Sequence, residues 1–182
     1  MTILNIDDSV LVVIDVQEKL LNAVFNKTSL EKKATTVANT AKILGIPVIV
    51  TEQYPKGLGA TVESLKNVLP EDTQYFEKTA FSALDNKEVK DALKKLGKKQ
   101  VVIFGIETHI CVSQTTNALI QEDFDVSVIK DACGSRAEYE YLAGLDRMKE
   151  NGAHLLTTEI ALFEWLKSAK NPKFKEVQAF IK

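Results

Sequence analysis

The stretch that decides the fold is VVIFGIETHICV, residues 101–112. Its first four residues, Val101 to Phe104, are apolar and predict a short buried strand. Gly105 ends that run, and from Thr108 onward the apolar positions follow helical spacing. We predict Thr108 as the N-cap of the helix, which places Cys111 in the first helical turn. Because free N–H groups and the positive end of the helix dipole meet there, we expect the pKa of the Cys111 thiol to be lowered.

Strand and helix patterns alternate along the rest of the chain. Short apolar or β-prone runs predict further strands at Val10–Ile14, Val48–Val50, Gln74–Phe76, Val126–Ile129 and His154–Thr157. Amphipathic spacing predicts helices at Ser29–Leu44, Thr61–Leu69, Asn86–Leu96, Ala137–Asn151, Ile160–Ser168 and Phe174–Ile181. This alternation is typical of a three-layer α/β/α fold with a doubly wound, mostly parallel, Rossmann-like sheet. We expect one domain over residues 1–182, because no linker or repeat divides the chain.

Composition and charge exclude several classes of protein. The net charge is −2 and no basic block is present, so we expect no nucleic-acid partner. No apolar run approaches the ~20 residues that span a bilayer, so we expect no membrane partner. The two cysteines form neither a disulfide framework nor a zinc set, and no targeting pattern is visible, so a cytoplasmic location is expected. Cys133 is predicted to be a structural residue.

Charged residues follow two of the predicted strands. Asp15 comes directly after the first strand, and Lys78 comes shortly after the third. If the strand order is 3-2-1-4-5-6, the first strand lies beside residues 101–104 where the winding of the sheet reverses. Asp15 would then face the turn that carries Cys111 across the ligand crevice. Singly, each residue also has a structural explanation: Asp15 as a helix cap, Lys78 as a surface lysine and Cys111 as a small buried residue.

Three motifs together carry a family resemblance. VVIDVQ around Asp15, FEKTAFSA around Lys78 and GIETHICV around Cys111 resemble the isochorismatase-like cysteine hydrolase superfamily. The similarity runs nearly end to end, through KDACGSR at residues 130–136 to FKEVQAFIK at residues 174–182. TEQYPKGLG and FKEVQAFIK are most similar to isochorismatase-domain-containing proteins.

The resemblance implies that Asp15, Lys78 and Cys111 form a catalytic set. A thiol is mostly protonated at neutral pH, so a base must take its proton as the sulfur attacks. Asp15 would be that base, and Lys78 would hold Asp15 and stabilise the thiolate. Which of Asp15 and Lys78 carries the proton stays open at this point. Attack on the carbonyl carbon of a small-molecule substrate, with loss of ammonia or an amine, would leave a thioester that water hydrolyses.

The resemblance also implies a site for the oxyanion that forms during attack. The backbone N–H groups of Glu107 and Cys111 would hold it, with Ile106 and Gln17 as further oxyanion- or substrate-binding residues. Related proteins have a cis peptide bond just before the first of these donors, so we expect one between Ile106 and Glu107. By the same analogy we expect a homo-oligomer, to which the amphipathic segment Phe174–Ile181 would contribute.

The chain departs from the nicotinamidase branch of the superfamily at one place. Those proteins carry an Asp-x-His pattern and a second His that bind a metal, whereas Thr51–Gly59 contains no His and Glu52 alone makes no metal site. We therefore expect no metal and no cofactor, and predict a metal-independent hydrolase of a small amide. The alternative is a non-enzymatic oligomeric protein for binding or thiol sensing. A dinucleotide-binding protein is disfavoured because DVQEKL (Asp15–Leu20) has no glycine-rich turn.

Overall fold

Six parallel strands form the central sheet of the computed structural model, which describes residues 3–181. Residues 1, 2 and 182, which belong to the predicted domain, lie outside the described residues. The strands are β1 (Ser9–Ile14), β2 (Val48–Gln53), β3 (Gln74–Lys78), β4 (Gln100–Gly105), β5 (Asp125–Ile129) and β6 (His154–Leu156). Their order is β3-β2-β1-β4-β5-β6, so the predicted doubly wound sheet is confirmed.

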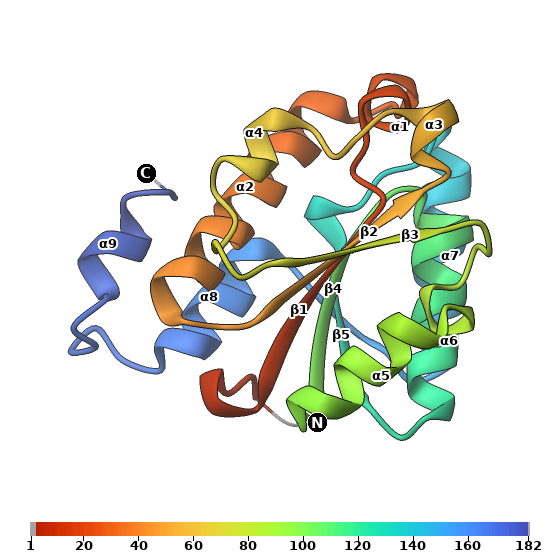
Figure 1. The fold of residues 1–182 in the computed structure, drawn as a ribbon. Coiled ribbons are helices and arrows are strands. Elements are labelled where there is room, and N and C mark those ends of the chain that lie inside the picture. Colours follow the sequence, from red (N-terminus) through yellow and green to blue (C-terminus); the bar gives the residue numbers. More distant parts are fainter. Residues whose placement is uncertain (1–2, 182) are drawn as a thin grey trace.

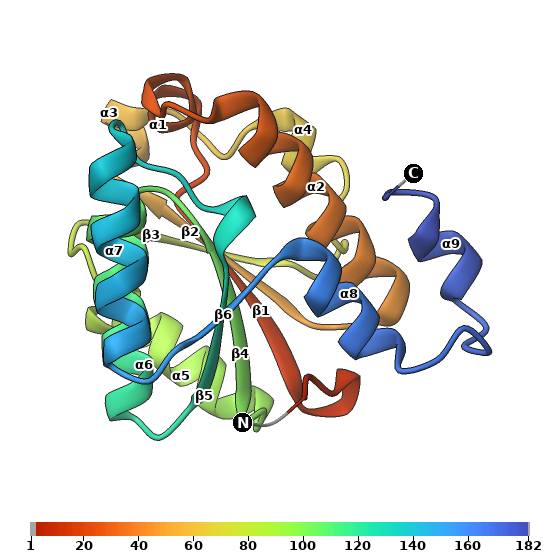
Figure 2. The same ribbon diagram turned by 180° about the vertical axis from the view of Figure 1, so that it is seen from behind.

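Two helical layers cover the sheet. The α-helices are α1 (Glu18–Ala23), α2 (Lys27–Leu44), α3 (Pro55–Leu58), α4 (Glu63–Lys66), α5 (Lys87–Leu96), α6 (Ser113–Gln121), α7 (Glu138–Glu150), α8 (Thr158–Leu166) and α9 (Phe174–Gln178). Figures 1 and 2 show α5, α6 and α7 on one face and α2 and α8 on the other, with α9 beside α2. This is the three-layer arrangement that the alternating pattern predicts. No helix within residues 3–181 is both long enough and apolar enough to cross a bilayer.

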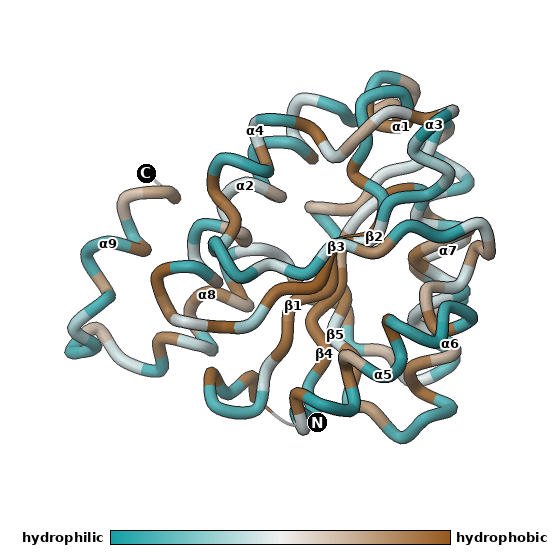
Figure 3. The backbone as a smooth tube through the Cα atoms, in the orientation of Figure 1, coloured by the Kyte–Doolittle hydropathy of each residue, from teal (hydrophilic) through white to brown (hydrophobic). Residues whose placement is uncertain are grey.

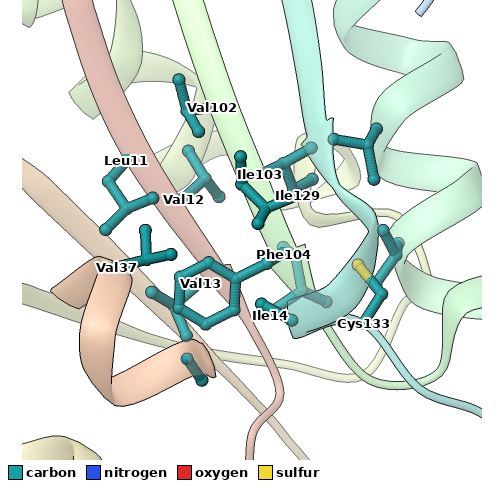
Figure 4. Close-up of a cluster of buried hydrophobic side chains, with 14 of the residues drawn as sticks. Leu11, Val12, Val13, Ile14, Val37, Val102, Ile103, Phe104, Ile129 and Cys133 are labelled. Carbon is teal, nitrogen blue, oxygen red and sulfur yellow. The ribbon is translucent and has the colours of Figure 1, made fainter. Parts of the chain in front are cut away.

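The core lies along β1 and β4, the two central strands. Every residue of both strands is buried, because helices cover both faces of the sheet there. Their continuous apolar runs follow from this double burial. Figure 3 shows the central strands as the most hydrophobic part of the chain. In Figure 4 side chains of β1 and β4, such as Val13 and Phe104, pack with Val37 of α2 and with Cys133.

The switch point of the sheet lies between β1 and β4, where Ile14 pairs with Gly105. Gly105 has a φ of 145°, and a Cβ atom there would lie 2.0 Å from the Ile14 carbonyl oxygen. Only glycine allows this close approach of the two strand ends. Beyond it, the Ile106 N–H donates to the same carbonyl at 2.9 Å. The segments that follow β1 and β4 therefore leave the sheet side by side, as a switch-point crevice requires.

Two local predictions need correction. The stretch Thr51–Gly59 is not a loop throughout, because β2 continues to Gln53 and α3 follows at Pro55–Leu58. The predicted N-cap at Thr108 is also wrong. Glu107 takes the cap position of a π-helical turn, Thr108–Val112, and the Thr108 N–H donates to the Gly134 carbonyl at 2.9 Å.

Candidate active site

Asp15 directly follows β1, at the carboxyl end of the central strands, where the winding of the sheet reverses. Its φ is 51°, a left-handed conformation that Asp tolerates better than most residues. Its N–H donates to the Thr51 carbonyl at 3.1 Å, and its Oδ1 accepts a hydrogen bond from the Thr51 hydroxyl at 2.7 Å. The carboxylate is fully buried, so the ends of β1 and β2 fix its position together.

Lys78, the last residue of β3, directs its ammonium at the same carboxylate. Nζ donates to Asp15 Oδ2 at 2.6 Å, and neither side chain is exposed. Removing two charges from water is costly, and a buried pair persists where further hydrogen bonds satisfy it. Here Gln53 Oε1 accepts a second hydrogen bond from Nζ at 2.6 Å. A buried ion pair is an inefficient way to stabilise a fold, so it marks a candidate functional site.

Cys111 reaches this pair from β4. The peptide bond between Ile106 and Glu107 is cis, and the chain then enters the π-helical turn Thr108–Val112 before continuing as α6. Cys111 is the fourth residue of that turn and is 6% exposed. The structure thus brings together the three residues that the motifs single out, from the ends of β1, β3 and β4.

The electrostatics of Cys111 differ from the prediction. Burial, followed by the negative charge of Asp15, raises the pKa of the Cys111 thiol to about 12, and the positive charge of Lys78 opposes this. The expected lowering of the pKa is therefore wrong. It considered the helix terminus alone, whereas desolvation and a nearby carboxylate both disfavour a thiolate. Cys111 stands as a neutral thiol beside an ion pair.

Glu107 supplies both a backbone donor and a buried carboxylate. Within residues 3–181, no hydrogen-bond acceptor is found for its N–H group. Its carboxylate accepts hydrogen bonds from the backbone N–H and Nε of Arg136, at 2.9 and 3.0 Å. By contrast, the neighbouring N–H of Ile106 is already bonded to Ile14. Ile106 itself is fully buried.

Gln17 has a different place from the one expected of a substrate-binding residue. Its Nε2 donates to the carbonyls of Gln53 and Gly59, at 3.0 and 2.6 Å, and its Oε1 accepts the Gln53 N–H at 2.6 Å. The side chain is fully buried. Gln17 therefore ties the segment after β2 to the end of β1.

Sequence reasoning missed two residues of this cluster, Thr51 and Gln53. Thr51 holds Asp15, and Gln53 holds Lys78. A usable signal was present, because side chains two apart in a strand lie on the same face. Thr51 and Gln53 share a face only because the strand continues past Val50 to Gln53. The predicted loop at TEQYPKGLG ends the strand too early for this relation to be seen.

The acidic residue in this segment also has a structural partner. Glu52 Oε1 accepts hydrogen bonds from the backbone N–H and hydroxyl of Thr61, both at 2.7 Å. Within the described part of the chain, no group of three His, Cys, Asp or Glu side chains is arranged as metal ligands.

Fold and cluster together define a class: a doubly wound α/β protein with a buried thiol beside a carboxylate–ammonium pair at the switch point. The isochorismatase domain model matches residues 9–160, and the chain belongs to this family. Membership gives the protein a hydrolase-type function and confirms the superfamily that the motifs indicate.

Several relatives match over almost the whole chain. Isochorismatase domain-containing protein 2 of Xenopus laevis is 41% identical over 174 residues, which cover 95% of this chain and 83% of that protein. The structure of MAR1 ribonuclease from Caenorhabditis elegans has a TM-score of 0.94 at 40% identity and covers 98% of this chain and 91% of that one. The YcaC gene product of Escherichia coli, described as an octameric hydrolase of unknown specificity, has a TM-score of 0.88 at 28% identity, covering 97% and 94%.

Proposed function

We propose that this protein is a cysteine hydrolase that cleaves the C–N bond of a small amide, with Cys111 as the nucleophile. The observation that carries the proposal is the buried Lys78–Asp15 ion pair at 2.6 Å, whose two charges act on the Cys111 thiol. Covalent catalysis needs a nucleophile next to a base, and a third group that holds the base in place.

The first chemical step moves a proton to Asp15. With a pKa of about 12, the Cys111 thiol is protonated at neutral pH, so the proton leaves as the sulfur attacks. The S–C bond forms, the proton passes to the Asp15 carboxylate, and the carbonyl π electrons move onto oxygen. The N–H groups of Glu107 and Cys111 hold that oxyanion. Lys78 keeps its positive charge beside the reacting groups throughout.

The intermediate then collapses and is hydrolysed. The carbonyl re-forms, the C–N bond breaks, and Asp15 returns its proton to the leaving nitrogen, which departs as ammonia or an amine. A water molecule then attacks the thioester and gives a proton to Asp15. When the C–S bond breaks, that proton returns to Cys111 and a carboxylic acid leaves. Asp15 thus serves as base and acid in turn.

We also propose that residues 1–182 form one domain that works as a homo-oligomer without a metal or cofactor. The octameric state of the E. coli relative supports the oligomer. The commitment of Glu52 to Thr61 supports metal independence, because this carboxylate holds its own segment in place. Light scattering tests the oligomer, and a monomeric mass would contradict it.

Turnover of small amides tests the proposed function. Ammonia or amine release is measured over a panel of small amides for the wild type, Cys111→Ala and Cys111→Ser, with and without a chelator. Cys133→Ser is the matched control, because Cys133 is a fully buried thiol outside the cluster. We expect cleavage by the wild type and the control, unaffected by chelation, and none by the Cys111 variants. Normal rates in Cys111→Ala would remove Cys111 from the mechanism.

Two other functions have weaker support. A protein for binding or thiol sensing would retain Cys111 but cleave no amide in the panel, so the same experiment separates it from an enzyme. The ribonuclease name of the C. elegans relative does not extend to this chain. The net charge of this chain is −2, which gives no overall electrostatic attraction to a polyanion such as RNA.

A further inference from the structure

The Lys78 ammonium is surrounded by more acceptors than it has protons. Two oxygens lie at 2.6 Å, Asp15 Oδ2 and Gln53 Oε1, and the carbonyls of Ala80 and Phe81 lie at 3.3 and 3.2 Å. An ammonium has three N–H groups. The Cys111 sulfur, on which Lys78 also acts, must therefore compete with four oxygens for them.

Hydrogen bonds hold the Gln53 side chain so that its amide oxygen accepts one of the two shortest hydrogen bonds from the Lys78 ammonium. Its Nε2 donates to the Thr79 carbonyl at 2.8 Å, and Gln17 pairs with its backbone N–H and carbonyl at 2.6 and 3.0 Å. The Tyr54 N–H, next in the chain, donates to the Lys78 carbonyl at 2.9 Å. This segment therefore holds Lys78 at two places: Tyr54 bonds to its backbone carbonyl, and Gln53 bonds to its ammonium.

We propose that Gln53 is a positioning residue that holds the Lys78 ammonium against Asp15 and limits what it can give to the Cys111 sulfur. This inference rests on the proposed function in one respect, that Cys111 is the reacting group. It adds a residue whose role is to keep the resting thiol protonated.

The sign of the effect can be derived for two substitutions. Gln53→Met keeps an unbranched side chain of similar length but removes the acceptor, which leaves a Lys78 N–H group for the sulfur. The thiolate is then stabilised, so alkylation of Cys111 speeds up. Gln53→Glu places a second carboxylate on the same ammonium. The added negative charge disfavours the thiolate, so alkylation slows.

The test is the rate at which iodoacetamide labels Cys111, followed by mass spectrometry from pH 7 to 10 in a Cys133→Ser background. A tenfold change in thiolate changes this rate only about three- to fourfold, because nucleophilicity falls with the thiol pKa. We expect labelling at pH 8 at least about threefold faster in Gln53→Met and about threefold slower in Gln53→Glu. Gln121→Met and Gln121→Glu are the matched controls, since Gln121 is exposed at the far end of α6.

Folding is checked through Trp165, which is fully buried and donates to the Ser9 hydroxyl at 3.0 Å, so its fluorescence reports native packing. If Gln53→Met fails to fold, the Glu variant, which keeps an acceptor for Lys78, carries the test. Labelling rates in the folded Gln53 variants that match wild type, or that change in the same direction, overturn the inference. Because labelling needs no substrate, this failure is distinct from failure of the proposed function, which Cys111→Ala with undiminished amide cleavage would reveal.

Discussion

Asp15→Asn should move two measured rates in opposite directions. Asn has the same shape and can still accept the Thr51 hydrogen bond, but it removes the negative charge that helps to raise the pKa of Cys111 to about 12. At that pKa only about one thiol in 10⁴ is ionised at pH 8. Without the Asp15 charge, Lys78 is the charged group left beside the sulfur, and the pKa falls. Alkylation of Cys111 at pH 8 should therefore be at least about threefold faster.

Turnover should fall in the same variant. A positioned base contributes about 10²- to 10⁴-fold, so amide cleavage should drop by about that factor although the thiolate is more abundant. The assay compares iodoacetamide labelling of Cys111 with ammonia release on the same preparation, in a Cys133→Ser background. If Asp15→Asn slows labelling as well as turnover, Asp15 favours the thiolate in the resting protein, and the role assigned to it here is wrong.

Two further predictions concern stability. Lys78→Met should lower the free energy of unfolding by about 3–5 kcal/mol, because Asp15 is left buried without its cation. Adding Asp15→Asn should restore at least about half of that loss, and urea unfolding of the double variant checks this; a further decrease would contradict it. Burial raises the pKa of Cys133 to about 12, above the ~8.5 of an unfolded cysteine, so its contribution to stability is complete below pH 8.5 and is lost toward pH 12. Cys133→Ser should remove about 1.4 kcal/mol per pH unit from the alkaline decline in unfolding free energy, and equal slopes in the two proteins between pH 9 and 11 would refute it.

The sheet was predictable because a strand that is buried on both faces has a continuous apolar sequence. Val10–Ile14 and Val101–Phe104 are uninterrupted apolar runs, and helical patterns between the strands require parallel connections. The edge strand β3 was harder to predict, because most of its residues are exposed. The sequence pattern predicts a strand only at Gln74–Phe76, whereas the observed strand ends at Lys78.

The candidate site was predictable in its members but not in its hydrogen bonds. Asp15, Lys78 and Cys111 stand in recognisable motifs, and the switch point brings two of them together. The hydrogen-bond partners of Gln17 and Gln53 could not be predicted, because the partner of a side-chain amide depends on which backbone folds against it. The thiol pKa was mispredicted for a related reason, since desolvation and the Asp15 charge arise only in the assembled fold.

The position of β3 at the edge of the sheet divides the candidate site into two parts of unequal local stability. Asp15 and Cys111 follow the two central strands, in which we expect the amide hydrogens to exchange only through near-global opening. Lys78 ends a strand with a neighbour on one side only, and such a strand opens at lower free energy. We therefore expect a partly opened molecule to keep the Cys111 thiol and the Asp15 carboxylate in place while it loses the Lys78 ammonium. Warming or mild denaturant would then abolish the assembled site before the fold, and hydrogen exchange in Gln74–Lys78 would follow the loss.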